Sequence, residues 1–120
     1  MKTSKYFVEA EFQKCSPACS LEDMDPVTVD MLDRAREIAG IPFLLISAYR
    51  SINWDKSKGR SGTGAHTLGK AVDIQCNSLQ NRFKIVNALL QAGFKRIGIA
   101  DSFIHADTSN AHNQNVIWLY

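Results

Sequence analysis

Apolar residues recur at helical spacing in the first half of the chain. Asp25 and Pro26 precede them, and these residue types are favoured at a helix N-cap and at the first helical position. Gly40 follows the last of them and is a typical helix stop. The pattern predicts a helix over 26–39. Its recurring positions are Thr28, Met31, Leu32, Ala35, Ile38 and Ala39.

A second amphipathic helix is predicted after Asn77 and Ser78, which can cap its first turn. Gly93 supplies its C-terminal stop. The apolar stripe expected to face the core consists of Leu79, Phe83, Val86 and Leu90.

Strands are predicted between and after these helices. Residues 43–48 form a short apolar run, and residues 71–76 alternate, so that Asp73 faces away from Val72 and Ile74. Further strands are expected around 96–99, 103–107 and 116–120. This order predicts an α+β fold, with a mainly antiparallel sheet and helices packed on one face. A length of 120 residues corresponds to one domain over 1–120.

Composition excludes several classes of protein. A formal charge of +2 is too small for a dedicated nucleic-acid binder, and no apolar run approaches the roughly 20 residues of a membrane span. The first residues carry charge where a signal peptide needs an apolar core, so we expect synthesis in the cytosol. Cys15 and Cys19 lack the second pair of a zinc ribbon, and Cys76 is expected to fill the core.

Two histidines and an aspartate stand out as candidate metal ligands. His66 lies seven residues before Asp73, and His105 lies on a predicted strand whose Phe103, His105 and Asp107 point to one side. Two imidazoles and a carboxylate leave one position of a catalytic zinc site open. Spacing alone leaves ordinary surface or core histidines as an alternative.

Four ordered blocks make the chain similar to the M15 zinc peptidases, within them the D-Ala-D-Ala carboxypeptidase-like branch of bacteria and their phages. The hedgehog and DD-peptidase type of fold is implied by the same resemblance. The blocks are 47–51 (SAYRS), 65–74 (AHTLGKAVDI), 103–108 (FIHADT) and 116–120 (VIWLY).

The resemblance implies that His66, Asp73 and His105 bind one Zn²⁺ per chain and that Arg50 faces the substrate, a peptidoglycan stem peptide. A guanidinium suits this role because it can hold a carboxylate or a carbonyl that develops negative charge. The long polar loop over 51–65 could add a wall of a substrate groove, with Trp54 as its aromatic platform.

The general base is less well defined by the sequence. Some family members carry an acidic residue three positions before the last ligand, where this chain has Ser102. Asp107 is the preferred candidate because it shares a strand face with His105, and its alternative role is to support that histidine. Asp101 has the same parity and is a further candidate.

Two functions from different classes therefore stand side by side. The first is a monomeric zinc peptidase that cleaves stem peptides at a bond involving a D-amino acid, as a carboxypeptidase or an endolysin-type endopeptidase. It would act on the cell wall after holin-type or another route of release, with neither nucleic acid nor membrane as a partner. The second is a non-catalytic zinc-containing module that binds cell wall or protein.

Overall fold

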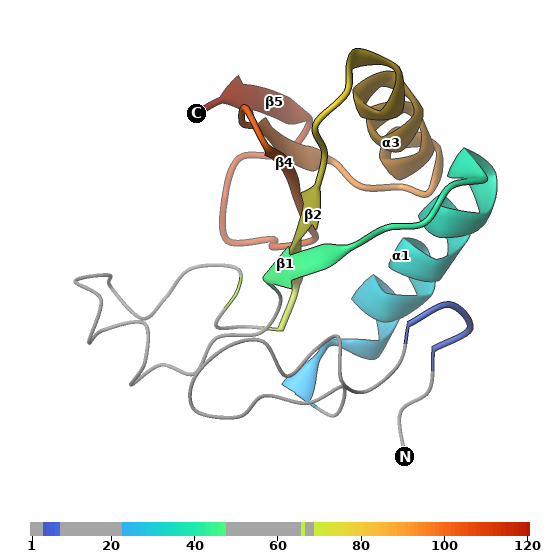
Figure 1. Ribbon diagram of the computed structural model, residues 1–120. Coiled ribbons are helices and arrows are strands. Elements are labelled where there is room, and N and C mark those ends of the chain that lie inside the picture. The colour runs from blue at the N-terminus through green and yellow to red at the C-terminus, as the bar shows by residue number, and fades with distance from the viewer. Residues whose placement is uncertain (1–3, 8–22, 48–65, 67–68) are drawn as a thin grey trace.

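Two helices cover one face of a five-stranded sheet in the computed structural model, which describes residues 4–7, 23–47, 66 and 69–120 (Figure 1). This arrangement confirms the predicted α+β class, while the extent of the domain over 1–120 stays a prediction. In chain order the elements are α1 (Pro26–Ala39), β1 (Leu45–Ser47), β2 (Ala71–Gln75), α3 (Leu79–Gln91), β3 (Arg96–Ile99), β4 (Phe103–Asp107) and β5 (Val116–Leu119).

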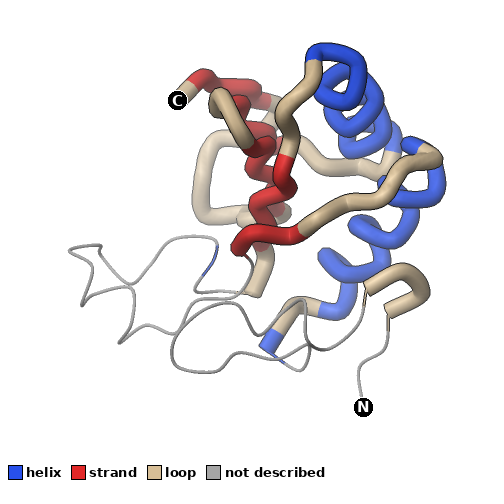
Figure 2. Tube along the Cα trace, in the orientation of Figure 1, coloured by secondary structure: helices blue, strands red, loops and turns tan. Residues whose placement is uncertain are grey.

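The strands lie in the order β1-β2-β4-β3-β5, and the long β2 and β4 strands occupy neighbouring positions. All pairs are antiparallel except β3 with β5. A loop over 108–115 joins β4 to β5 (Figure 2). β5 lies at the sheet edge next to β3 and runs parallel to it.

Capping residues set the ends of both helices as the sequence predicts. The Asp25 carboxylate accepts a hydrogen bond from the Thr28 backbone N–H at 3.0 Å, and the Ser78 hydroxyl accepts one from Asn81 N–H at 3.0 Å. Gly40 ends α1 in the left-handed conformation, with φ of 69°.

The core lies between the helices and the sheet face that carries Val72, Ile74 and Ile104. Asp73 points to the opposite face, as the alternation predicts. Cys76 is a free, buried core residue, also as predicted, whereas Cys15, Cys19 and the loop 51–65 lie outside the described residues.

The stripe predicted for α3 is wrong for three of its four residues: Val86 packs against the core, but Leu79, Phe83 and Leu90 are exposed. Leu79 and Phe83 are 75% and 74% exposed, while the buried side of the helix carries Ile85, Ala88 and Leu89. Both sets fit a helical period, and the buried set belongs to the core between α1, α3 and the sheet. The open face of α3 therefore keeps an exposed apolar patch.

Candidate metal centre

A tight turn and two central strands place the three predicted ligands on the sheet face opposite the helices. Asp73 in the middle of β2 is the direct cross-strand partner of His105 in the middle of β4. His66 precedes the turn at Gly69, whose N–H donates to the His66 carbonyl at 3.2 Å. Gly69 has φ of 70°, and a Cβ there would collide with the backbone of Asp23. The glycine thus allows the turn that brings His66 to β2.

One oxygen of Asp73 is close to both imidazoles. Asp73 Oδ1 lies 2.9 Å from His105 Nδ1 and 3.4 Å from His66 Nε2. All three side chains are buried, and their donor atoms lie within 4.8 Å of one another. Ligands at about 2.0–2.1 Å from a tetrahedral zinc stand roughly 3.3 Å apart, so this N₂O donor set fits such an ion.

The charge state of the cluster follows from opposing effects. Burial alone would raise the pKa of Asp73, but hydrogen bonds and charge interactions with His105 and His66 hold that pKa well below its ordinary value. Burial alone would lower the pKa of His105, but the carboxylates of Asp107 and Asp73 raise it. The cluster therefore keeps an ionised carboxylate at neutral pH, which is the form a cation needs.

The second ring nitrogen of His105 faces Asp107. His105 Nε2 and Asp107 Oδ2 lie 2.6 Å apart, while Asp107 Oδ1 accepts hydrogen bonds from Arg96 Nε at 2.8 Å and Ser109 N–H at 3.1 Å. Burial works to raise the pKa of Asp107, and these contacts together lower it below its ordinary value. Both oxygens of the Asp107 carboxylate are thus engaged. Because Asp107 occupies Nε2 of His105, the other ring nitrogen, Nδ1, is the one that faces Asp73.

Three other predicted site residues, Arg50, Trp54 and Asp101, are not part of the described cluster. Arg50 and Trp54 lie outside the described residues, so their roles stay predictions. Asp101 is exposed in the bend between β3 and β4, next to the exposed Ser102.

Two residues beside the cluster were missed by the sequence reasoning. Arg96 contacts Asp107, and the Trp118 ring lies 5.4 Å from the ring of His105 and 5.0 Å from the Arg96 guanidinium, measured to ring centroids. Alternation along β3 could have placed Arg96 and Gly98 on one face. The position of β3 and β5 relative to β4, however, depends on the strand order, which no local sequence pattern determines.

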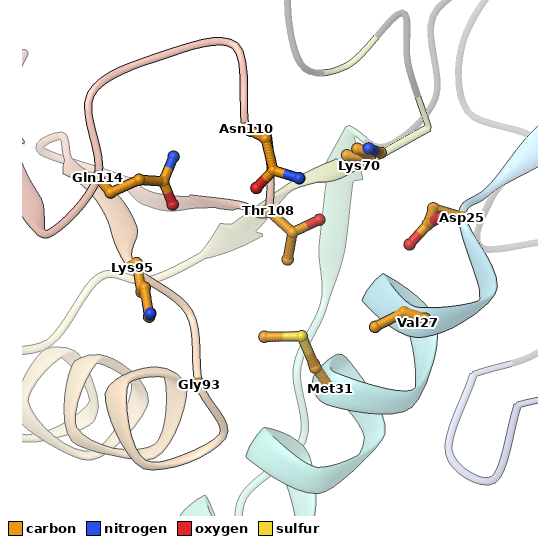
Figure 3. A pocket seen from close by; sticks show the side chains of 9 residues that line it. All are labelled: Asp25, Val27, Met31, Lys70, Gly93, Lys95, Thr108, Asn110 and Gln114. Carbon is orange, nitrogen blue, oxygen red and sulfur yellow. The ribbon is translucent and has the colours of Figure 1, made fainter.

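A separate pocket of about 410 Å³ lies at the sheet end, where the N-terminus of α1 comes near the turn after α3 (Figure 3). Lys70, just before β2, and Lys95, just before β3, line it together with Thr108, Asn110 and Gln114. None of the three candidate ligands lines this pocket. It is therefore distinct from the metal centre.

A buried His/Asp/His cluster on the sheet face opposite the helices is typical of a metal-dependent hydrolase. The family model for peptidase M15 matches residues 5–107, which is most of the 120 residues. The chain belongs to the peptidase M15 family, a family of metallopeptidases. No curated protein matches the chain. Among the described residues, no helix is long and apolar enough to cross a bilayer.

Proposed function

We propose that the chain is a zinc-dependent peptidase that hydrolyses peptidoglycan stem peptides at a bond involving a D-amino acid. The observation that carries the proposal is the buried convergence of His66, Asp73 and His105 in a chain of the M15 family. Three protein ligands are enough for a catalytic zinc site, because the fourth position is kept for water or substrate.

The protein side chains divide the work between holding the ion and handling the substrate. Bound zinc would lower the pKa of its water to about 7 and polarise the scissile carbonyl. His66, Asp73 and His105 would hold the ion, since their donor atoms already converge. Arg50 would hold the terminal carboxylate or the carbonyl oxygen of the peptide, and Trp54 would form a wall of the groove.

The proposal extends to the setting in which the chain works. The partner is the peptidoglycan stem peptide, and the protein acts as a monomer. It reaches the cell wall from the cytosol after holin-type or another route of release.

A non-catalytic zinc-containing module is the second candidate function. It is favoured by Asp107, whose two oxygens are both occupied by protein donors, so that this carboxylate is poorly placed to take a proton from water. Such a module would bind zinc with the same three ligands and recognise cell wall or protein without cleaving it.

Digestion of purified peptidoglycan with the zinc-loaded protein, followed by mass spectrometry of the products, tests the proposal. We expect loss of a terminal D-alanine or cleavage within the stem peptide, and the product masses identify the bond. His66→Ala should abolish both zinc binding and cleavage. Arg50→Ala should retain zinc and lower kcat/KM by about 10²-fold or more.

The outcomes separate the two functions. Zinc uptake by the wild type without any cleavage would support the binding module and contradict the peptidase. Full zinc retention in His66→Ala would remove the proposed ligand set.

A further inference from the structure

Arg96 contacts Asp107, the carboxylate that faces His105 Nε2, and the Trp118 ring lies beside the His105 ring. We propose that both are positioning residues for His105: Arg96 acts through Asp107, and Trp118 acts through its contacts with the His105 ring and the Arg96 guanidinium. Together they keep His105 Nδ1 facing Asp73. The inference rests on the metal centre of the proposed function and assigns no chemistry to either residue.

Arg96 fixes Asp107 by a directed contact. Its Nε donates to Asp107 Oδ1 at 2.8 Å, in an ion pair whose side chains are 13% and 1% exposed. A carboxylate this deeply buried needs both hydrogen bonds and a countercharge to stay ionised. Because the other oxygen, Oδ2, lies 2.6 Å from His105 Nε2, the orientation of the carboxylate determines the orientation of the ring.

The guanidinium is itself held on two further sides. Its Nη1 donates to the Asn113 carbonyl in the loop after β4, at 2.6 Å, and its Cζ lies 5.0 Å from the centroid of the Trp118 ring. The planar guanidinium has several N–H donors, so it can contact Asp107, the Asn113 carbonyl and the Trp118 ring at the same time. The ammonium group of a lysine cannot both donate in two such directions and stack on the ring.

Gly98 explains how Trp118 reaches His105 from two strands away. In the sheet register, Gly98 on β3 is the partner of both His105 on β4 and Trp118 on β5. A Cβ at Gly98 would come within 2.6 Å of the indole, so the ring occupies the space above the glycine. There it lies 5.4 Å from the His105 ring, between that ring and the edge of the sheet.

Zinc competition with a chromophoric chelator tests the proposal. Arg96→Gln and Trp118→Ala should each weaken zinc binding by about 10-fold to 100-fold, the range typical of lost support to a ligand. Trp118→Phe retains an aromatic face and should stay close to the wild type. Arg96→Lys restores charge alone, so its affinity should lie between those of Arg96→Gln and the wild type.

Arg36→Gln is the matched control. Arg36 also stacks on an aromatic ring, with its guanidinium 5.0 Å from the Tyr6 centroid, but it lies on α1 away from the cluster. This variant should bind zinc like the wild type. If it weakens zinc binding as much as Arg96→Gln, the effect is general destabilisation and the positioning role is overturned.

An ionised Asp107 at 2.6 Å favours a proton on His105 Nε2, and nuclear magnetic resonance of the metal-free and the zinc-loaded protein can detect it as a second readout. We expect a slowly exchanging signal in the wild type and in Trp118→Phe, and its loss or rapid exchange in Arg96→Gln and Trp118→Ala. An unchanged signal together with wild-type zinc affinity in these two variants would overturn the proposal. If the wild type binds no zinc, the proposed function fails, while the comparison in metal-free protein still decides the positioning role.

Discussion

The two ring nitrogens of His105 have different surroundings, and this difference bears on the role of Asp107. Nδ1 faces Asp73 and Nε2 faces Asp107, so each nitrogen has a carboxylate partner. A general base must accept a proton from the attacking water and must lie within hydrogen-bond reach of it. The Asp107 side chain is 1% exposed and already accepts from Arg96 and Ser109, so its contacts favour support of His105.

Asp107→Asn distinguishes these roles. The amide oxygen can still face His105 Nε2, but the uncharged side chain loses the ion pair with Arg96, so we expect zinc affinity to fall by about 10-fold to 100-fold. Chelator competition and steady-state kinetics on the same preparation measure metal binding and turnover together.

Asp101→Asn serves as the companion variant because Asp101 is exposed and was the other candidate base. Unchanged zinc affinity in Asp107→Asn, with kcat lower by roughly 10²-fold, would instead make Asp107 the base. A fall of that size in Asp101→Asn alone would assign the base to Asp101.

At the scale of single elements, α3 shows that a helical period does not choose the buried side. Leu79, Phe83 and Leu90 satisfy the period yet remain exposed, because Ile85, Ala88 and Leu89 face α1 and the sheet. Only the packing partner selects between two apolar faces of one helix, and that information lies in distant parts of the chain.

A matched pair of variants on α3 tests this orientation. Leu89→Ala should lower the free energy of unfolding by about 2–5 kcal/mol, because Leu89 is fully buried and its truncation leaves a cavity. Phe83→Ala should change it by no more than about 0.5 kcal/mol, because the side chain is exposed. Urea unfolding measures both, and equal losses in the two variants would contradict the observed face.

Local patterns predicted the parts of the fold and site that depend on neighbouring residues. Alternation placed Asp73 opposite Val72, and caps placed the ends of α1. The contacts of Arg96 and Trp118 were not predictable in this way, because they depend on β3 lying between β4 and β5. Strand order arises from the packing of the whole chain, which periodicity does not encode.

At the scale of the whole molecule, zinc and pH should act on stability together. In the metal-free chain the raised pKa of His105 stabilises the fold below the ordinary histidine pKa, and this contribution disappears as pH rises through the raised value. The lowered pKa of Asp73 contributes stability above the ordinary aspartate pKa, which is lost as pH falls through the lowered value. The metal-free protein should be most stable between these limits.

Zinc should therefore stabilise the protein more at about pH 8 than at about pH 6, since binding must displace the proton that His105 holds at the lower pH. At a free zinc concentration of about 100 times Kd, the gain is roughly 2.7 kcal/mol. Thermal unfolding with and without chelator at both pH values measures it. His66→Ala is the control and should show little zinc response, and an equal zinc effect at both pH values would contradict the coupling.

The sheet register has a consequence for misfolding. The buried residues of β4 alternate between the two faces of the sheet. Ile104 and Ala106 face the core, and His105 and Asp107 lie on the opposite face, at the candidate metal centre. A slip of one residue would move both ionisable side chains into the hydrophobic interior and both apolar side chains out of it. The two faces of β4 therefore both disfavour the same mispairing with β2. The polar side chains of the candidate metal centre thus also protect the chain against wrongly aligned, aggregation-prone sheets.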